Sequence, residues 1–484
     1  MSKIEVKKEA KYDFGLIGLG AMGMNLLLNM GDHGISATGY DTDPAKCELL
    51  DQEGKRTHLK GFHDITAFVA GLKKPRAIIM LVPAGKIVDD VIAELAFLLE
   101  RGDILIDAGN SYFKDTERRS KELSAKGFHF IGMGISGGEE GARRGPSLMP
   151  GGDREAFDVI KPVLTAIAAK VDRTPCVAYI GPGASGHFVK MVHNGIEYGL
   201  MQLIAETYEI LKKGLHMNNE VIGALFNKWN TGRLGSFLLE ITAYIFTYKE
   251  SGQQHFLLDE IKDEARGKGT GKWTSQVAMD LEVPVPTIDI AVSMRDLSRY
   301  KNLREQAAEL YNEPARLGLV PVGFLNALEE AFYISMMMTY AQGMHLLAKA
   351  SEIYGYKLDL GEIARIWRGG CIIRSAFLSD VAKAYQAEPA LPHLLLDKHI
   401  QRLVANAETG ARKVLSATVT AGIATPAYAA SISYFDAFRS QRMPANLIQA
   451  QRDLFGAHTY ERTGQTGVFH TQWVIEEERD HRLI

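Results

Sequence analysis

Two patterns of apolar positions divide most of the chain. Between Tyr12 and about Ile180, segments of helical periodicity alternate with short apolar runs, namely DFGLIGLG, ISATGY, RAIIMLVP, DILIDAGN and FHFIGMGISGG. This alternation is typical of β-α units wound into a mainly parallel sheet. After about Ser185, long amphipathic segments such as LNALEEAFYISMMMTY predominate. The pattern predicts an α/β domain of the Rossmann dinucleotide-binding type over residues 1–184, followed by a large all-α domain over residues 185–442.

The last segment, residues 443–484, differs from both domains. Its stretch AHTYERTGQTGVFHTQWV is rich in Gly, Thr and His and shows no helical period. We expect an extended C-terminal tail, which would need a surface on which to lie.

Composition excludes several classes of protein. Of 484 residues, 46% are hydrophobic and 23% charged, which is ordinary for a globular protein. The polar start MSKIEVKKEAK has no apolar run of the kind that targets a chain to a membrane, so we expect a cytoplasmic protein that does not bind membranes. The 3 cysteines are scattered, so we expect neither a disulfide framework nor a bound metal. The net charge of −3 gives no indication of a nucleic-acid surface.

A glycine-rich turn follows the first predicted strand. The run FGLIGLGAMGMNLLLNM places Gly18, Gly20 and Gly23 in the pattern GxGxxG, directly before an apolar-periodic helix. In such a turn the first glycine permits the tight bend, the second lets a pyrophosphate approach the backbone, and the third allows close packing of helix on strand. The context therefore predicts a dinucleotide site.

An acidic residue ends the second predicted strand. Asp41 lies 18 positions after Gly23, where a carboxylate can accept hydrogen bonds from the adenosine ribose hydroxyls. The segment YDTDP holds two acids and no Arg or Lys, and a carboxylate repels a 2′-phosphate. We therefore expect NAD rather than NADP. Asp43 either shares this role or is only a turn residue before Pro44.

The segment GPGASGHFVKMVHNGIEYG carries a polar stripe. At about 100° per residue, Lys190, His193, Asn194 and Glu197 fall on one side of a helix. Taken alone, this stripe favours an ordinary solvated helix face, with a reaction site as the alternative.

Three further glycine-bearing stretches stand out. DAGNS (Asp107–Ser111) and GISGGEEGARRGPSLMPGG (Gly134–Gly152) follow predicted strands, so they should lie as loops at the carboxyl edge of the sheet, where α/β proteins bind ligands. In ARGKGTGKWT (Ala265–Thr274), backbone amides and the ammonium of Lys268 or Lys272 can cradle a phosphate. A solvated hinge is the alternative for this third stretch.

In order along the chain, seven motifs resemble those of the 6-phosphogluconate dehydrogenase family: IGLGAMGMNLLLNM, DAGNS, SGGEEGARRGPSLMPGG, HFVKMVHNGIEYG, KGTGKWT, WRGGCIIRSAFL and ANLIQAQRDLFGAHTYE. The resemblance extends from about Tyr12 to Trp473. It implies oxidative decarboxylation of a phosphorylated sugar acid in the pentose phosphate pathway, with reduction of NAD or NADP. It also implies a homodimer whose C-terminal tails cross between subunits.

The resemblance assigns two catalytic roles. Lys190 is the base that deprotonates the substrate 3-hydroxyl, and it then acts as an acid toward the new ketone so that the β-keto acid loses carbon dioxide. Glu197 protonates C1 of the resulting enediol. This chemistry requires Lys190 to begin neutral and Glu197 to begin protonated.

The resemblance also implies a set of binding residues. The substrate carboxylate and hydroxyls would be held by Asn110, Ser136, Gly137, Gly138, His193 and Asn194. The phosphate would be held by Tyr198, Lys268, Thr270 and Arg295, with Arg452 and His458 of the partner subunit. The cofactor would contact Gly18, Gly20, Ala21, Met22, Gly23, Asp41, Thr42, Val82 and Asn110.

The sequence departs from the common family pattern at two places. Asp41, Thr42 and Asp43 replace an Asn-Arg-Thr whose Arg binds the NADP 2′-phosphate, and Pro83 replaces a usual Lys. Both changes remove cations from the cofactor region, which strengthens the expectation of NAD, with NADP as the lesser possibility. Two alternatives to the main hypothesis are another β-hydroxyacid dehydrogenase and a dinucleotide-binding homologue that has lost catalysis.

Overall fold

The computed structural model describes residues 11–55, 57–267, 269–311, 317–318 and 322–473. The chain forms two compact units, Met1–Ile432 and Ser433–Ile484.

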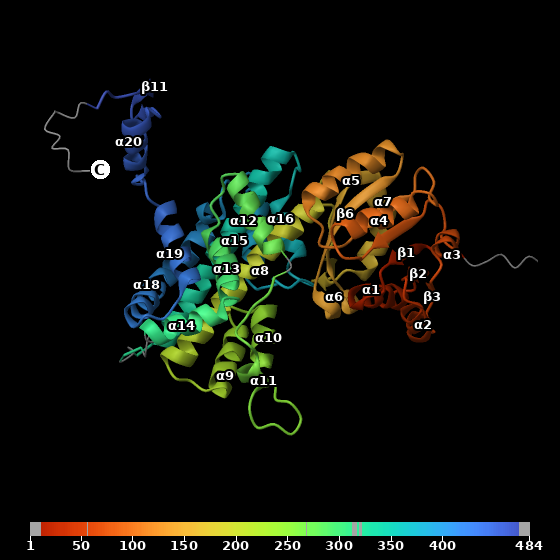
Figure 1. Ribbon diagram of the computed structural model, residues 1–484, viewed down its shortest axis with the longest axis horizontal. Helices are drawn as coiled ribbons and strands as arrows, with labels where there is room; N and C mark the ends of the chain where they lie inside the picture. Colours follow the sequence, from red (N-terminus) through yellow and green to blue (C-terminus); the bar gives the residue numbers. More distant parts are fainter. Residues whose placement is uncertain (1–10, 56, 268, 312–316, 319–321, 474–484) are drawn as a thin grey trace, which may run out of the picture. The chain divides into compact units, whose positions relative to one another are not determined.

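A seven-stranded sheet organises the first part of the larger unit, in the strand order β3-β2-β1-β4-β5-β6-β7 (Figure 1). The strands are β1 (Phe14–Ile17), β2 (Ala37–Tyr40), β3 (Leu59–Phe62), β4 (Ala77–Met80), β5 (Ile104–Asp107), β6 (His129–Ser136) and β7 (Ser147–Gly152). Strands β1 to β6 pair in parallel and β7 runs antiparallel to β6. The predicted Rossmann-type sheet is therefore confirmed.

Two strands of this sheet and one helix were not predicted. β3 is the short run LKGF, whose apolar content is too low to stand out. The end of β6 agrees with the predicted strand FHFIGMGISGG, but the rest of the stretch Gly134–Gly152, predicted as a loop, contains helix α6 (Gly138–Arg144) and all of β7. That prediction was wrong because the glycines suggested a turn, whereas backbone pairing with β6 holds the segment SLMPGG in the sheet.

Helices cover both faces of the sheet (Figure 1). Besides α6 they are α1 (Ala21–Asp32), α2 (Pro44–Glu53), α3 (Ile65–Ala70), α4 (Lys86–Leu95), α5 (Phe113–Ala125) and α7 (Arg154–Ile167). Neighbouring strand residues point to opposite faces, so Leu16 and Ile79 belong to one apolar core while Ile17 and Ile78 belong to another. A two-stranded antiparallel pair, β8 (Lys170–Val171) with β9 (Thr174–Pro175), precedes the helical part.

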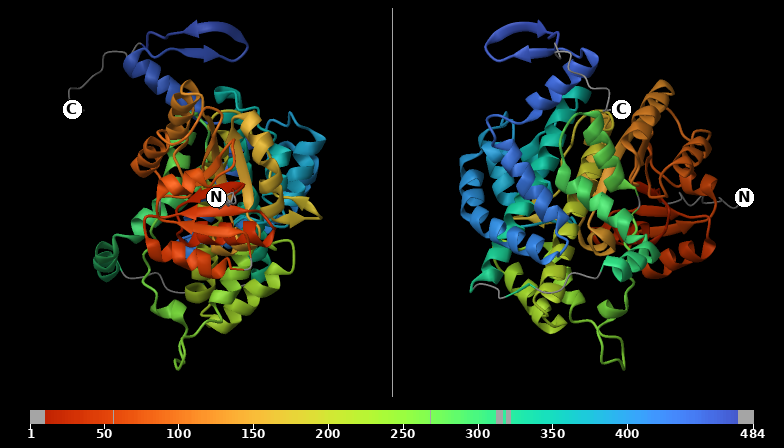
Figure 2. Two further views of the ribbon diagram at one scale, coloured as in Figure 1. Left: turned by 90° about the vertical axis from the view of Figure 1, so that its right-hand side faces the viewer. Right: turned by 60° about the vertical axis from the view of Figure 1, so that its left-hand side comes forward.

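The helical part begins with α8 (Ser185–Glu209), which packs against β6 and β7 on one side and against helices α12, α13 and α15 on the other. Figure 2 shows the helices that follow. Within the described ranges they are η1 (Ile210–Gly214), α9 (Asn219–Asn230), α10 (Phe237–Ile245), α11 (Leu257–Glu260), α12 (Thr270–Asp280), α13 (Pro286–Ser298), α14 (Lys301–Tyr311), α15 (Phe324–Tyr354), α16 (Leu360–Ile366), α17 (Leu378–Ala387), η2 (Leu394–Leu396), α18 (Lys398–Ala421) and α19 (Pro426–Phe438), the last of which crosses into the smaller unit. This confirms the predicted large helical region.

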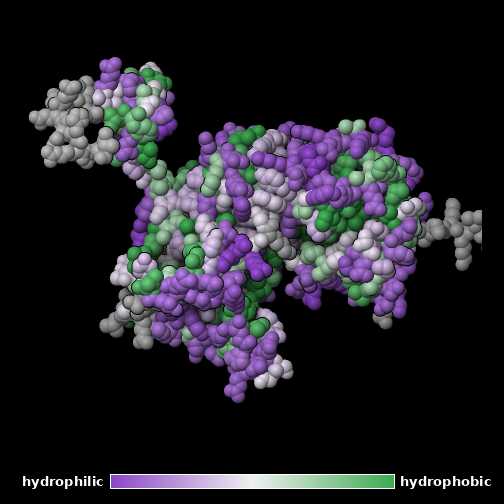
Figure 3. All heavy atoms as spheres, in the orientation of Figure 1, coloured by the Kyte–Doolittle hydropathy of each residue, from purple (hydrophilic) through white to green (hydrophobic). Residues whose placement is uncertain are grey.

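The smaller unit is more ordered than the predicted extended tail. It contains helix α20 (Ala445–Gly456) and an antiparallel hairpin of β10 (Tyr460–Arg462) and β11 (Gln465–Phe469). Strong helix formers follow Pro444, and Gly464 adopts a φ of 76° at the hairpin turn. Apolar side chains of α20 remain exposed, among them Leu447 (61%) and Phe455 (73%). Figure 3 shows hydrophobic surface on the coloured part of this unit.

Candidate active site

The glycine-rich turn has the geometry of a dinucleotide site. Gly18 adopts a φ of +100°, and a Cβ there would lie 2.5 Å from the Leu81 carbonyl oxygen; a Cβ at Gly23 would lie 1.9 Å from the Gly18 oxygen. A Cβ at Gly20 would meet no atom within 4 Å, so the space in front of this residue is free for a ligand. Ala21 and Met22 begin α1, whose first turn holds no acidic residue, so the helix N-terminus can accept a pyrophosphate.

Asp41 lies beside this turn at the end of β2. Its Oδ2 accepts a hydrogen bond from the Leu19 amide at 2.8 Å, and its Oδ1 accepts one from the Asp43 amide at 3.0 Å. The Lys46 ammonium lies 3.3 Å from both oxygens. Sequence reasoning missed Lys46, which stands outside YDTDP but reaches back by one turn of α2. Thr42 is exposed next to Asp41.

Asp43 takes the turn role left open above. Its side chain caps α2 by accepting a hydrogen bond from the Ala45 amide at 3.0 Å.

Three loops meet at the carboxyl edge of the sheet. A Cβ on Gly18 would lie 3.3 Å from a Val82 methyl group, and one on Gly109 would lie 3.1 Å from the Val82 oxygen. The exposed side chain of Asn110 follows directly. The glycine turn, the end of β4 and the DAGNS loop are therefore adjacent, as expected for loops that follow neighbouring parallel strands.

A buried ion pair anchors the DAGNS loop. Arg119 of α5 is only 1% exposed. Its Nη1 lies 3.2 Å from Oδ2 of Asp107, which is fully buried. The same guanidinium binds Asp89 and the Gly85 carbonyl, and its hydrogen bonds hold the pKa of Asp89 at about 2. Nothing in the amino-acid pattern identified Arg119, because its partners come from two segments distant in the chain, the start of α4 and the end of β5.

The polar stripe on α8 is largely buried, so the solvated-face alternative is wrong. Lys190 is 6% exposed, His193 0% and Asn194 7%. Lys190 fits there because Gly134 of β6 has no side chain: a Cβ at that position would lie 2.5 Å from the Lys190 Cβ. Burial lowers the pKa of Lys190, which favours the neutral amine that can accept a proton.

His193 links Lys190 to the sheet. The Lys190 Nζ lies 3.4 Å from His193 Nδ1, and His193 Nε2 lies 3.1 Å from the Ser136 hydroxyl. Burial, together with the neighbouring Lys190, lowers the pKa of His193 well below its ordinary value, so the ring is neutral and carries one proton. His193 Nδ1 also lies 3.2 Å from the Asn194 Oδ1, which can only accept, so with its proton on Nδ1 the ring donates to Asn194 and its Nε2 accepts a hydrogen bond from Ser136.

Glu197 lies one turn further along α8. Its Oε2 is 4.0 Å from His193 Nδ1, and its side chain is 23% exposed. Desolvation raises the pKa of Glu197, which favours the protonated acid. One helix therefore presents an amine with a lowered pKa and a carboxyl with a raised pKa, the two opposed protonation states required of a base and an acid.

The region after β6 completes one wall. The Ser136 hydroxyl also accepts a hydrogen bond from the Ile372 amide at 3.3 Å. Gly137 adopts a φ of +123°, and a Cβ there would lie 2.6 Å from the Gly370 oxygen. Gly138 begins α6. The WRGGCIIRSAFL segment thus packs beside the stripe, with Trp367 edge-on to the His193 ring at 5.5 Å between centroids.

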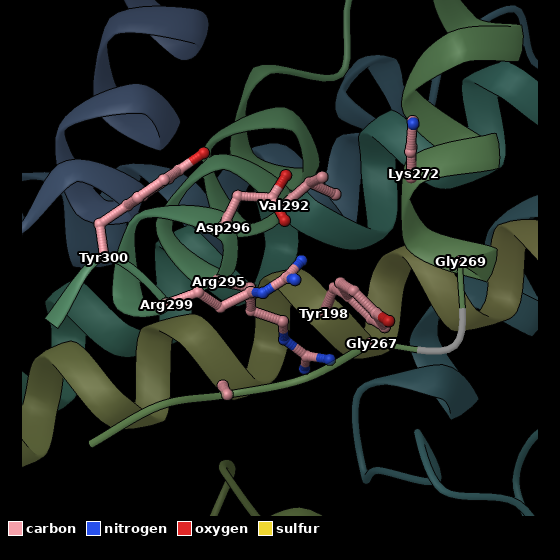
Figure 4. A pocket seen from close by; sticks show the side chains of 10 residues that line it. Tyr198, Gly267, Gly269, Lys272, Val292, Arg295, Asp296, Arg299 and Tyr300 are labelled. Carbon is pink, nitrogen blue, oxygen red and sulfur yellow. The ribbon is translucent and has the colours of Figure 1, made fainter. Parts of the chain in front are cut away.

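A polar cavity of about 520 Å³ lies against Tyr198, the next residue on α8 (Figure 4). The Arg295 guanidinium of α13 lies 3.5 Å from the centre of the Tyr198 ring. Arg299 and Lys272 also line the cavity, together with the acidic Asp296, and in Figure 4 the Lys272 ammonium points away from the two guanidinium groups. Arg295 and Arg299 on one cavity are a suitable pair for a dianion such as a phosphate.

The KGTGKWT segment forms the other side of this cavity. Gly267 and Gly271 approach so closely that a Cβ on either would lie 2.5 Å from Tyr198. Thr270 is buried at the start of α12, which is tied to α8 by a hydrogen bond of 2.8 Å from Thr274 to the Met191 carbonyl. The hinge alternative is therefore wrong for Thr270–Thr274, which belong to α12, and it stays untested for the exposed residues 265–267. Lys268 lies outside the described residues.

Arg452 and His458 lie in the smaller unit. Arg452 is on α20, where its Nη1 donates to Gln449 Oε1 at 3.1 Å, and His458 follows the end of that helix. Both are exposed.

Sequence reasoning missed Arg299, which also lines this cavity. Arg299 directly follows the end of α13, four positions after Arg295, so the two side chains leave the chain on the same side. That spacing was a signal available in the sequence, but only the fold shows that this side borders Tyr198.

Every helix in the described ranges is too short or too polar to cross a membrane. In those same ranges, no three His, Cys, Asp or Glu side chains gather in a way that would hold a metal ion.

Comparison with known proteins covers nearly the whole chain. Residues 13–181 match the NAD binding domain of 6-phosphogluconate dehydrogenase, and residues 186–473 match the C-terminal domain of 6-phosphogluconate dehydrogenase. The NADP(+)-dependent, decarboxylating 6-phosphogluconate dehydrogenase of Bacillus subtilis is 48% identical over 470 residues, which cover 96% of this chain and 100% of that protein. A decarboxylating 6-phosphogluconate dehydrogenase of Arabidopsis thaliana is 46% identical over 95% of this chain and 96% of that protein.

A solved structure has the same fold over the same length. Plasmodium falciparum 6-phosphogluconate dehydrogenase, determined in its apo form, with its cofactor NADP+ and with its substrate 6-phosphogluconate, is 43% identical. It superposes with a TM-score of 0.92 over 95% of this chain and 100% of that one.

Proposed function

The chain belongs to the 6-phosphogluconate dehydrogenase family, and we propose that it catalyses the oxidative decarboxylation of 6-phospho-D-gluconate to D-ribulose 5-phosphate and CO2 with reduction of NAD(P). The observation that carries this proposal is the pairing on α8 of a buried amine, whose pKa is lowered, with a carboxyl whose pKa is raised. The adjacent cationic cavity suits the substrate phosphate. The alternative of another β-hydroxyacid dehydrogenase is not favoured, because the family match extends through the second domain.

Lys190 begins the reaction as a neutral amine. His193, whose Nδ1 lies 3.4 Å from Nζ, helps to hold the amine in place, and the neutral amine has a lone pair free to accept the proton of the substrate 3-hydroxyl. The ammonium that results then stabilises the negative charge that develops on the C3 oxygen as CO2 departs, so no metal is needed for this step. The substrate carboxylate raises the local negative charge, which favours protonation of Lys190 at this stage.

Glu197 finishes the reaction as an acid. The enediol left by decarboxylation needs a proton at C1, and a carboxyl whose pKa is raised by desolvation is suited to supply one. Because the two groups lie on one helix two turns apart, their separation is set by the helix rather than by flexible loops.

The residues around the glycine turn fit a nicotinamide dinucleotide. Open space at Gly20 and the N-terminus of α1 suit the pyrophosphate, Asp41 suits the adenosine ribose, and Val82 and Asn110 border the same edge. When bound, the nicotinamide supplies the acceptor for the hydride that leaves C3.

Our proposal includes a preference for NAD. The Asp41 side chain is only 11% exposed and is held by the Leu19 amide, so it cannot turn far away from a 2′-phosphate. Thr42 offers no cation, whereas Lys46 partly offsets the Asp41 charge. The preference therefore rests on Asp41 and Thr42 together. It is a property of these residues and not of the relatives, since the Bacillus subtilis protein is NADP(+)-dependent.

The proposal further includes a cytoplasmic homodimer in the pentose phosphate pathway whose exchanged tails bring Arg452 and His458 of the partner subunit to the phosphate. These points rest on the family resemblance. The exposed apolar residues of α20 support them, because such a surface calls for a partner.

The test is the initial rate of reduced-cofactor formation with 6-phosphogluconate, measured with NAD and with NADP. We expect a higher kcat/KM with NAD, and loss of activity in Lys190→Met but not in Lys161→Met, an exposed lysine on α7. A dominant NADP rate would refute the cofactor preference alone. No rate with either cofactor would refute the activity and favour the catalytically inactive homologue.

A further inference from the structure

A single buried carboxylate organises the smaller unit. Asp453 of α20 is 0% exposed. Its Oδ1 accepts hydrogen bonds from the Thr459 amide at 3.0 Å and from His470 Nδ1 at 2.9 Å. Its Oδ2 accepts hydrogen bonds from the Thr471 amide at 3.0 Å and from Trp473 Nε1 at 2.9 Å. Four donors from the segments on either side of the hairpin therefore converge on one side chain of the helix.

These bonds keep Asp453 charged. Desolvation acts to raise the pKa of Asp453, but the hydrogen bonds from His470, Thr471 and Trp473 outweigh it and hold the pKa at about 2. The carboxylate is thus fully engaged within its own unit. It leaves the neighbouring Arg452 and the nearby His458 as exposed basic groups.

The backbone around His458 is held in an unusual shape. Ala457 and Thr459, on either side of His458, have φ values of 51° and 61°. Non-glycine residues adopt this left-handed conformation rarely, and they keep it only where the surroundings enforce it. Here the Ala457 amide donates to the Asp453 carbonyl at 2.9 Å, the Thr459 amide donates to the Asp453 carboxylate, and Gln449 Nε2 donates to the Thr459 carbonyl at 2.5 Å.

We infer that Asp453 is a positioning residue that fixes Arg452 and His458 in the geometry in which they bind the substrate phosphate in the partner subunit's active site. This inference rests on the function proposed above. Asp453 itself touches no substrate. It closes the turn after α20 so that a guanidinium and an imidazole are presented together, without an ordering cost on binding.

The test compares Asp453→Asn with a control, Glu461→Gln. The control also removes one negative charge, but from an exposed side chain on β10. Asparagine keeps the shape but cannot accept all four hydrogen bonds. We expect KM for 6-phosphogluconate to rise about 10- to 100-fold in Asp453→Asn, with kcat and the cofactor KM nearly unchanged. Glu461→Gln should match the parent enzyme. An unchanged KM in folded Asp453→Asn overturns the inference.

A mixed dimer separates positioning of the partner's site from an effect within the same subunit. When an Asp453→Asn chain is paired with a Lys190→Met chain, one site combines an intact Lys190 with an intact tail. We expect that site to regain the parent KM. Activity that keeps the raised KM would show that Asp453 acts within its own subunit and would overturn the inference.

Arg452→Ala distinguishes this inference from the proposed function. An unchanged KM in Arg452→Ala would refute the role of the tail itself. A raised KM in Arg452→Ala with an unchanged KM in Asp453→Asn would refute only the positioning role.

If Asp453→Asn fails to form dimers, the same assays are made on Trp473→Phe, which removes one of the four donors. A smaller rise in KM that the mixed dimer corrects supports the inference. An unchanged KM in Trp473→Phe refutes it.

Discussion

The close approach of β6 to α8 gives a quantitative prediction for Gly134→Ala. The added methyl group would lie 2.5 Å from Cβ and 3.0 Å from Cγ of Lys190, and 3.2 Å from the Gly186 oxygen. Ordinary contacts begin at 3.4 Å, so Lys190 must move by about 1 Å. A displacement of about 1 Å in a reacting group costs about 10²-fold in rate, and overpacking of this kind costs about 1–3 kcal/mol of stability.

Steady-state kinetics with 6-phosphogluconate would measure this effect. We expect kcat to fall about 100-fold in Gly134→Ala while KM changes less, because the added methyl group meets Lys190 and Gly186, neither of which lines the phosphate cavity. Gly141→Ala is the control, since its methyl group would lie 3.6 Å from the nearest atom and Gly141 is within α6. A parent-like kcat in folded Gly134→Ala would refute the placement of Lys190 as the base.

Three further changes test other parts of the structure. Asp41→Asn combined with Thr42→Arg removes a repulsive charge and adds a cation, so the ratio of kcat/KM for NADP to that for NAD should rise; an unchanged ratio excludes Asp41 as the selector. Glu197→Gln cannot donate a proton, so kcat should fall about 10²- to 10⁴-fold, whereas an undiminished rate would exclude Glu197 as the acid. Burial raises the pKa of Glu206 to about 7 from 4.5, so the folded state binds this proton more tightly. Glu206 therefore contributes to the free energy of unfolding below pH 4.5, and about 3 kcal/mol of this contribution is lost as the pH rises to 7. Urea unfolding at several pH values should show this loss in the parent protein and should not show it in Glu206→Gln.

Local sequence patterns predicted those helices, strands and turns that are marked by residues close together in the chain. The strand, glycine turn and helix around Gly18 and Gly23 were predictable because each glycine's role depends on neighbours a few residues away. The short strand β3 and the strand β7 were not, because pairing with another strand, rather than local apolar content, holds them in the sheet. The helix α20 was missed because the Gly- and Thr-rich segment after it dominated the interpretation of the tail.

In the candidate site, too, local sequence patterns predicted some features and only the fold decided the others. The helical spacing of Lys190, His193 and Glu197 is visible in the chain, but by itself it favoured a solvated face over a reaction site. Burial decided between them, and burial comes from β6, where Gly134 admits the lysine, and from the segment that contains Trp367. Likewise, Lys46 lies within a few residues of Asp41, yet only the turn into α2 directs its ammonium toward that carboxylate.

The sequence by itself therefore determined the order of the two domains, the family resemblance and the residue types of the chemistry, because these depend on periodicity and short motifs. The tertiary structure alone decided the protonation states that Lys190 and Glu197 favour, since desolvation is set by groups distant in the chain. It also decided that Arg119 anchors the DAGNS loop and that Asp453 closes the turn at His458. Each of those contacts joins separate segments, and no local pattern encodes which donor a buried carboxylate will meet.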